Sequence, residues 1–136
     1  MEWQLFTTAE VIVLHDRAIV AKELQGLATG RSLDGALARI EHRIQYGVIL
    51  DAFDLAATYA MALAQGHVFN DANKRTAYAC MNLCLIKHGI RIAFEIKAIG
   101  EIIIKVTEGH MDERELAEWL RKKAKENSKK RIRGFD

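Results

Sequence analysis

The chain has 136 residues, of which 50% are hydrophobic and 28% charged, and its formal net charge is +2 at pH 7. We therefore expect one domain with a substantial hydrophobic core. The sequence contains no run of 18 apolar residues and does not start with a signal peptide, which argues against a membrane span and secretion and predicts a cytoplasmic protein.

The first half of the chain shows helical patterning, and glycines mark its breaks because the sequence contains no proline. We expect a first helix from about Thr8 to Leu24, with Thr7 and Glu10 forming a capping box. His15 lies within this helix, either as a partly buried, hydrogen-bonded histidine or as a residue that lines a site. Ser32 is a good N-cap for a second helix.

Two helices with many small or apolar residues occupy the middle of the chain. Asp51 is expected to cap a helix of about Ala52 to Gln65, and Gly66 to end it in a left-handed conformation. A helix from about Ala72 to Lys87 follows. It is apolar on most sides, so we expect it at the centre of the fold.

The two cysteines, Cys80 and Cys84, are four residues apart on that central helix. Positions on consecutive helical turns suit disulfide geometry poorly. We expect both thiols to be buried as small hydrophobic side chains. Too few further Cys or His ligands stand at suitable spacing to predict a zinc site.

The last part of the domain contains two more helical segments. Ile90 to Phe94 alternates apolar and other residues and is compatible with a short extended piece. A compact apolar helix is expected from Ile96 to Val106, and Asp112 caps a final helix. Together the elements predict an all-α fold, a compact bundle of about six helices.

The end of the chain is strongly basic. Residues 121–136 hold eight Lys or Arg and two acidic residues, net +6, whereas residues 1–120 carry twelve basic and sixteen acidic residues, net −4. We expect a domain over residues 1–124 and a disordered basic tail over 125–136. Nucleic-acid binding by this tail is the alternative to a simply solvated terminus.

The stretch His67–Arg75 joins two predicted helices and contains the residue types of a phosphate site. It runs into a helix N-terminus, whose unpaired N–H groups attract anions. Lys74 and Arg75 add cationic donors. Asp71 is the kind of oxygen ligand that Mg²⁺ uses, and it also suits a helix cap. His67 suits a general base near neutral pH, so we predict phosphoryl or nucleotidyl transfer.

Known nucleotide-binding patterns of other kinds are absent. The sequence contains neither a Walker A loop nor the glycine-rich loop and H-R-D sequence of protein kinases. Phe69 is expected to point inward and hold the active stretch against the core.

The segment His67-Val68-Phe69-Asn70-Asp71-Ala72-Asn73-Lys74-Arg75 resembles the motif H-x-F-x-[D/E]-x-N-x-R of the Fic/Doc (Fido) superfamily, in the form of its Doc branch of phage death-on-curing toxins. Other segments also resemble that branch, namely Leu14-His15-Asp16, Ala36 to Arg43, Ala57-Thr58-Tyr59 and Gly89. The resemblance implies a Fic/Doc helical bundle.

The resemblance also implies a function. Doc-type members are kinases that transfer the γ-phosphate of ATP to a Thr or Ser hydroxyl of a protein, with elongation factor Tu as the expected target and arrested translation as the result. Carried over by position, the catalytic residues are His67, Asp71 and Lys74, the nucleotide-binding residues are Asn70, Asn73, Lys74 and Arg75, and the Mg²⁺ ligand is Asp71.

Two alternatives remain open. Fic-type members transfer AMP, but their motif has Gly where Lys74 stands and a second Arg where Tyr78 stands, and both differences count against AMP transfer here. A non-catalytic binding module that acts through the basic tail is the other alternative.

The resemblance further implies two contacts with other proteins. Doc-type toxins are neutralised by a Phd-like antitoxin, whose C-terminal helix binds a groove near the active loop. A flap ahead of the motif aligns the target chain by strand-like pairing. Residues 45–50 are either this flap or an ordinary transition from loop to helix.

Overall fold

The computed structural model describes residues 2–134, with side chains described as far as Ser128. The fold is all-α, as predicted, and the described residues form a β-type pairing only at an isolated antiparallel bridge between Leu27 and Phe69. No helix in the described part of the chain is long and apolar enough to cross a membrane. The six helices are α1 (Thr8–Ala18), α2 (Leu33–Gln45), α3 (Ala52–Gly66), α4 (Asn73–Lys87), α5 (Ile96–Thr107) and α6 (Glu113–Gly134).

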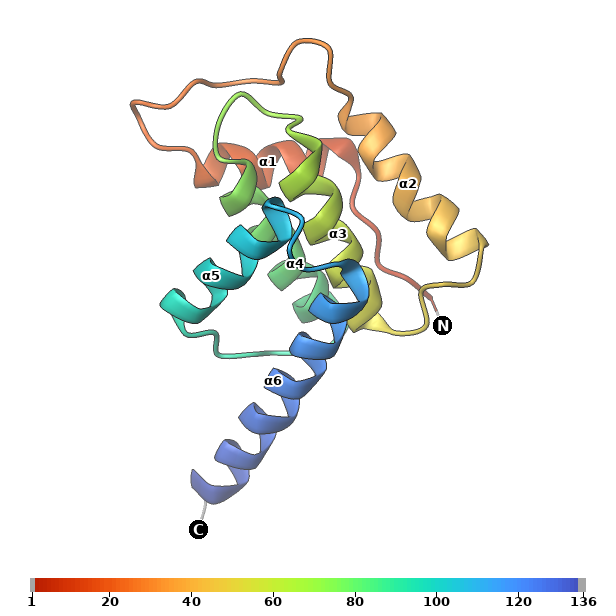
Figure 1. Ribbon diagram of the computed structural model, residues 1–136, viewed down its shortest axis with the longest axis vertical. Coiled ribbons are helices and arrows are strands. Elements are labelled where there is room, and N and C mark those ends of the chain that lie inside the picture. Colours follow the sequence, from red (N-terminus) through yellow and green to blue (C-terminus); the bar gives the residue numbers. More distant parts are fainter. Residues whose placement is uncertain (1, 135–136) are drawn as a thin grey trace.

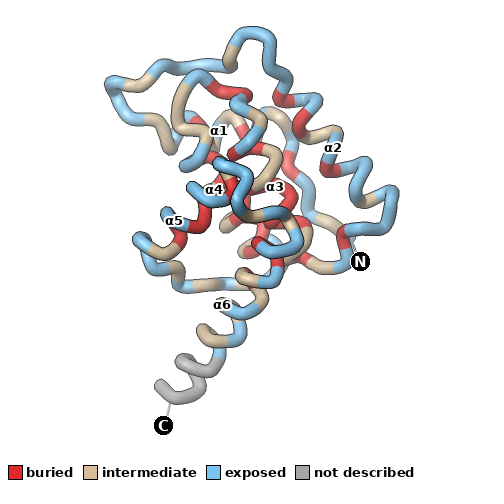
Figure 2. Tube along the Cα trace, viewed as in Figure 1, coloured by how far each residue is buried: buried red, intermediate tan, exposed pale blue. Residues whose placement is uncertain are grey.

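Helices α3 and α4 lie side by side at the centre of the molecule (Figure 1). Most residues of α3 are buried, and many of them are alanines, which allow neighbouring helices to approach closely. Helices α2, α5 and α6 pack against α3, and α1 and α5 pack against α4. Buried residues concentrate on this central pair (Figure 2). The short connection between α3 and α4 is the predicted active stretch.

Four of the predicted helix starts are confirmed, because the expected cap accepts a backbone N–H at the first turn. The accepting side chains are Thr7 for Glu10, Ser32 for Gly35, Asp51 for Asp54 and Asp112 for Glu115. Thr7 and Glu10 form the complete capping box.

Cys80 and Cys84 are free and fully buried, as expected. Burial raises the pKa of both thiols to about 12. They fill space between helices as small hydrophobic side chains.

The predicted end of the first helix is wrong. Helix α1 ends at Ala18 rather than Leu24, and Ile19 takes an extended conformation. Contacts with the active stretch hold the following residues away from the helix axis: the Arg75 guanidinium binds the Ala18 carbonyl, and Leu24 N–H binds Asp71. Tertiary contacts therefore override the helical patterning of residues 19–24.

Two connecting segments were left open by the sequence. Residues 90–94 belong to no strand, and the ring of Phe94 stacks on that of Trp119. Residues 45–50 run from the end of α2 to the residue before the N-cap of α3. The 15 residues of α3, about 22 Å of helix, separate them from the active stretch, and Ile49 is buried, which favours the ordinary transition over the flap.

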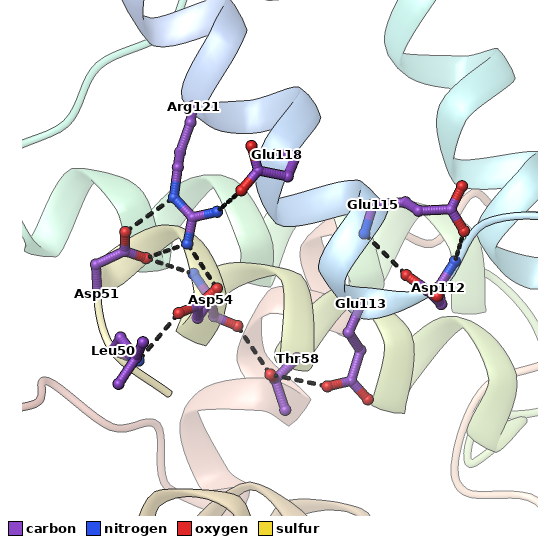
Figure 3. A network of polar contacts seen from close by, with 9 residues as sticks. All are labelled: Leu50, Asp51, Asp54, Thr58, Asp112, Glu113, Glu115, Glu118 and Arg121. Atoms are coloured by element: carbon purple, nitrogen blue, oxygen red, sulfur yellow. Dashed lines mark hydrogen bonds and ion pairs between the residues drawn. The ribbon is translucent and has the colours of Figure 1, made fainter. Parts of the chain in front are cut away.

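Helix α6 begins against α3 and then extends beyond the body of the molecule (Figure 1). Its Arg121 binds three carboxylates, those of Asp51 and Asp54 in the first turn of α3 and that of Glu118 (Figure 3). Burial alone would raise the pKa of Asp51, but its hydrogen bonds with Arg121 and with the Asp54 N–H lower it.

The structure continues α6 through Gly134, where the sequence predicted a disordered tail from residue 125. Good helix formers such as Lys, Ala and Glu span the expected boundary at residue 124. Asn127 also ties α6 to the connection between α4 and α5, because its Oδ1 accepts the Ala93 N–H. The division of the chain into a domain and a separate tail stays a prediction, and residues 135 and 136 lie outside the described residues.

Candidate functional site

The loop between α3 and α4 begins and ends with residues in the left-handed conformation. His67 has φ 49° and Ala72 has φ 64°, values that side chains other than glycine rarely adopt. His67, rather than Gly66, is thus the left-handed residue that ends α3. These two turns reverse the chain within six residues and leave His67 exposed at the edge of the loop.

The side chain of Asn73 holds the loop in shape. Its Oδ1 accepts the backbone N–H of Phe69 at 3.1 Å, and its Nδ2 donates to the carbonyl of the same residue at 2.9 Å. Phe69 is buried, as predicted, and its ring stacks on that of His15 with centroids 3.8 Å apart. The loop is thus fixed from α4 on one side and from α1 on the other.

The segment after α1 forms the outer wall of the loop. Ala28 N–H donates to the Val68 carbonyl at 2.8 Å, and Asn70 N–H donates to the Gly26 carbonyl at 3.1 Å. The Asn70 side chain donates to the Gln25 carbonyl at 2.9 Å. Residues 26–28 therefore pair with the motif in a strand-like way within this chain.

Asp71 is held at both its main chain and its carboxylate. Its carbonyl oxygen lies 2.9 Å from His15 Nε2, and its Oδ2 accepts the Leu24 N–H at 2.9 Å. The N-cap of α4 is Ala72, which makes no side-chain capping bond. The expectation that Asp71 caps this helix is therefore wrong, and no side chain caps the first turn of α4 at Ala72.

Arg75 links α4 to the segment after α1. Its guanidinium donates to the Ala18 carbonyl at 2.9 Å and binds the carboxylate of Glu23. Hydrogen bonds from the Val20 N–H and from Arg75 lower the pKa of Glu23. Lys74, by contrast, is exposed at the start of α4.

A pocket of about 430 Å³ lies over this loop and the N-terminus of α4. All six residues predicted to form the site line it. The lining residues are Glu23, Ala64, His67, Asn70, Asp71, Ala72, Asn73, Lys74, Arg75 and Thr107. The pocket therefore combines an imidazole, two carboxylates and two cations with an uncapped helix N-terminus, a combination suited to binding phosphates.

Comparison with known proteins identifies this arrangement. The profile of the Fic/DOC family matches residues 5–85, which include α1, the loop and nearly all of α4. The chain belongs to the Fic/DOC family. Among its relatives is the protein kinase doc of Escherichia phage P1, which is 33% identical over 114 residues, covering 83% of this chain and 90% of the relative.

The side-chain amides of Asn70 and Asn73 already form hydrogen bonds within the protein. Asn70 binds the carbonyl of Gln25, and Asn73 binds the main chain of Phe69. Contact of Asn73 with a phosphate through its backbone N–H at the helix N-terminus remains compatible with these bonds. Their assignment as nucleotide-binding residues stays a prediction.

The sequence analysis missed one carboxylate and left one histidine undecided. Glu23 lines the pocket of this Fic/DOC chain, although the sequence placed it in the last turn of a predicted helix. His15 is buried, with 1% of its surface exposed, and its ring contacts the carbonyl of Asp71 in the loop. Its place one residue before Asp16 in a family-like segment was the only signal, whereas nothing in the sequence marked Glu23.

Proposed function

We propose that this Fic/DOC chain is a Doc-type protein kinase that transfers the γ-phosphate of ATP to a Thr or Ser hydroxyl of a protein. The observation that carries this proposal is the pocket that joins His67, Asp71 and Lys74 at the uncapped N-terminus of α4. The relative named as a protein kinase supports it. The biological role proposed with it is that of a toxin in a toxin–antitoxin system, with elongation factor Tu as target.

The start of α4 provides the binding site for the ATP phosphates. An uncapped helix N-terminus presents N–H groups and a partial positive charge. Lys74 and Arg75 add positive charge at the same place. Arg75 is also held by the Ala18 carbonyl, so its guanidinium is already oriented before the nucleotide binds.

His67 is the proposed general base. It is exposed on the pocket side of the loop, where an acceptor hydroxyl can approach. The hydroxyl gives its proton to the imidazole while its oxygen forms a bond to the γ-phosphorus. The bond from that phosphorus to the bridging oxygen breaks, and ADP leaves with that oxygen.

The residues at the pocket fit a magnesium ion that takes most of its ligands from phosphates and water. Magnesium in such sites uses one or two carboxylates, and Asp71 and Glu23 both line the pocket. The described residues include no group of three potential metal ligands that would bind an ion without phosphates. Asp71 would hold the ion, which supplies charge neutralisation for the phosphates.

Two positions argue against AMP transfer. Lys74 replaces the glycine of the AMP-transferring members and narrows the phosphate site. Tyr78 replaces their second arginine, and its ring packs edge-on against Phe94, 5.8 Å away, instead of lining the pocket. The pocket thus lacks the cation that AMP transfer uses.

The test uses purified protein, Mg²⁺, elongation factor Tu and ATP labelled at either the γ- or the α-phosphate, followed by intact-mass analysis. We expect transfer of the γ label alone, with one phosphate added to the target. Transfer of the α label with the mass of AMP would replace the kinase with an AMP transferase. Absence of both labels from this target would contradict elongation factor Tu as substrate.

We also propose that a Phd-like antitoxin binds beside the active loop. A groove of about 280 Å³ between α1 and α4 is lined by Ala9, Glu10, Val13, Leu14, Arg17 and Leu83. Val13 is 48% exposed there, and α1 leads directly to Ala18, which holds Arg75. An amphipathic helix of a partner fits such an apolar groove.

Co-expression with the product of the neighbouring gene tests this contact. We expect the two proteins to purify together and Val13→Asp to break the complex, because it places a charge in the apolar groove. Ile104→Asp is the matched control, since Ile104 is similarly exposed, at 44%, on α5. Equal loss of binding in both variants would contradict a contact at the α1–α4 groove.

A further inference from the structure

A buried histidine of α1 contacts the active loop without lining the pocket. His15 is 56 residues before Asp71 in the sequence, and 1% of its surface is exposed. The pocket lining does not include it. Its position beneath the loop means that it can affect the pocket only through the residues that it touches.

Its ring makes three directed contacts. Nε2 lies 2.9 Å from the carbonyl oxygen of Asp71, and because a carbonyl can only accept, Nε2 is the donor. Nδ1 lies 3.2 Å from Asp16 Oδ1. The ring plane is parallel to that of Phe69, within 6°. The orientation of the imidazole is thus fixed about every axis.

Together with Leu24, His15 determines how Asp71 is presented. The His15 ring holds the carbonyl of Asp71, and the Leu24 N–H holds Oδ2 of its carboxylate. The neighbouring Ala72 is in the left-handed conformation, which is strained for a residue with a side chain, so the peptide between Asp71 and Ala72 needs such contacts to keep its orientation. Rotation of that peptide would move the carboxylate and the first N–H groups of α4 together.

We propose that His15 is a positioning residue, whose N–H to the Asp71 carbonyl fixes the carboxylate and the helix N-terminus in the pocket for phosphate transfer. This inference rests on the proposed function. The stacking on Phe69 needs only an aromatic ring, whereas the contact with Asp71 needs a donor at the position of Nε2. These two requirements can be separated by substitution.

The test compares two variants at this position. His15→Phe keeps an aromatic ring on Phe69 and removes the donor, whereas His15→Gln removes the ring and keeps an N–H near the position of Nε2. Tyr59→Phe is the control for stability alone: Tyr59 is buried, and its hydroxyl accepts the Phe6 N–H at 2.9 Å. All three variants and the wild type are measured for thermal unfolding, kcat and KM, and for amide hydrogen exchange of residues 70–73.

We expect His15→Phe to lower kcat by about 10- to 100-fold, the usual effect of removing a group that orients a metal ligand, with little change in KM for the protein target. Amide exchange of the loop is expected to accelerate in the same variant. His15→Gln restores most of kcat and of the protection. Tyr59→Phe lowers the unfolding temperature and leaves kcat and loop exchange as in the wild type.

Wild-type kcat and loop exchange in His15→Phe would overturn the inference. So would equal defects in His15→Phe and His15→Gln, since these would show that only the fit of the side chain matters. Loop exchange does not depend on transfer. Failure of the wild type to transfer phosphate would therefore contradict the proposed function, and the exchange data would still decide whether the His15 donor fixes the loop.

Discussion

His67 occupies a strained backbone position, with φ 49°, and its exposed side chain forms no hydrogen bond with a described residue. A residue with this combination contributes little to folding through its side chain. Its position at the rim of a pocket that also holds Asp71 and Lys74 is what gives it a role in the proposed chemistry.

His67→Asn tests that role directly. Asparagine tolerates the left-handed conformation, so we expect unfolding free energy within about 0.5 kcal/mol of the wild type. Nucleotide affinity is expected to stay unchanged and phosphate transfer to fall by about 10²- to 10⁴-fold, the contribution of a general base. Chemical unfolding, nucleotide titration and transfer rates measure the three quantities. A large loss of stability would assign His67 a structural role instead.

At the scale of elements, the loop depends on α4 through the two bonds of Asn73. We expect Asn73→Ala to lower the unfolding free energy by about 1–3 kcal/mol, because both backbone groups of the buried Phe69 lose their partner. Asn82→Ala on the same helix is the control and is expected to change stability by no more than about 0.5 kcal/mol. Urea unfolding of the three proteins provides the measurement. Equal stability of the two variants would show that these bonds add nothing.

The sequence predicted the number of helices, their order and most of their starts. The helix starts could be predicted because capping is a local interaction: Thr7 and Glu10, or Asp112 and Glu115, lie three residues apart. The motif loop could be recognised in the sequence because its residues are contiguous. The burial of Phe69 could be predicted because an aromatic side chain stands between two helices.

Other features depended on contacts between distant segments. The end of α1 at Ala18 and the place of Glu23 in the pocket both result from contacts with Arg75, more than 50 residues further along the chain. No local pattern encodes such contacts. The left-handed conformation of His67 was missed for a different reason, since glycine is the usual residue at that position and Gly66 stands next to it.

At the scale of the whole molecule, Arg121 joins the last helix, α6, to the start of the central helix α3 through Asp51 and Asp54. We expect Arg121→Met to lower the unfolding free energy by about 1–2 kcal/mol at pH 7, because these part-buried carboxylates lose a charged partner. Because α6 also packs against the central helix α3, the loss is expected to affect the whole cooperative unit rather than α6 alone.

The effect of Arg121→Met is expected to depend on pH. The folded protein has a lowered pKa at Asp51, against an ordinary value of 3.8. Its stabilising contribution is therefore complete above about pH 4 and disappears as the pH falls through the lowered value. Denaturant unfolding between pH 2 and 7 should show the two proteins converging at the acidic end. A difference in stability that stays constant down to pH 2 would contradict this assignment.

The basic part of α6 lies at the far end of the molecule from the pocket. Lys122 and Lys125 are exposed beside a groove of about 660 Å³ that begins at Phe53, in the first turn of α3. We expect Lys122→Glu/Lys125→Glu to leave phosphate transfer unchanged, because the length of α3 separates these residues from His67. Transfer rates measured at 0.15 M salt test this. A loss of transfer with intact nucleotide binding would instead show that the basic part of α6 contributes to function.

The arrangement of the pocket also has a consequence for the order of folding. Helices α3 and α4 are joined by six residues, so their association closes a short loop and is expected early. The contacts that complete the pocket connect residues 40 to 57 positions apart, from Ala28 with Val68 to Ala18 with Arg75. We expect these to form last. A refolding chain should therefore acquire most of its helix content before it can bind nucleotide. Detachment of α1 alone would abolish nucleotide binding while the central helix pair stays folded.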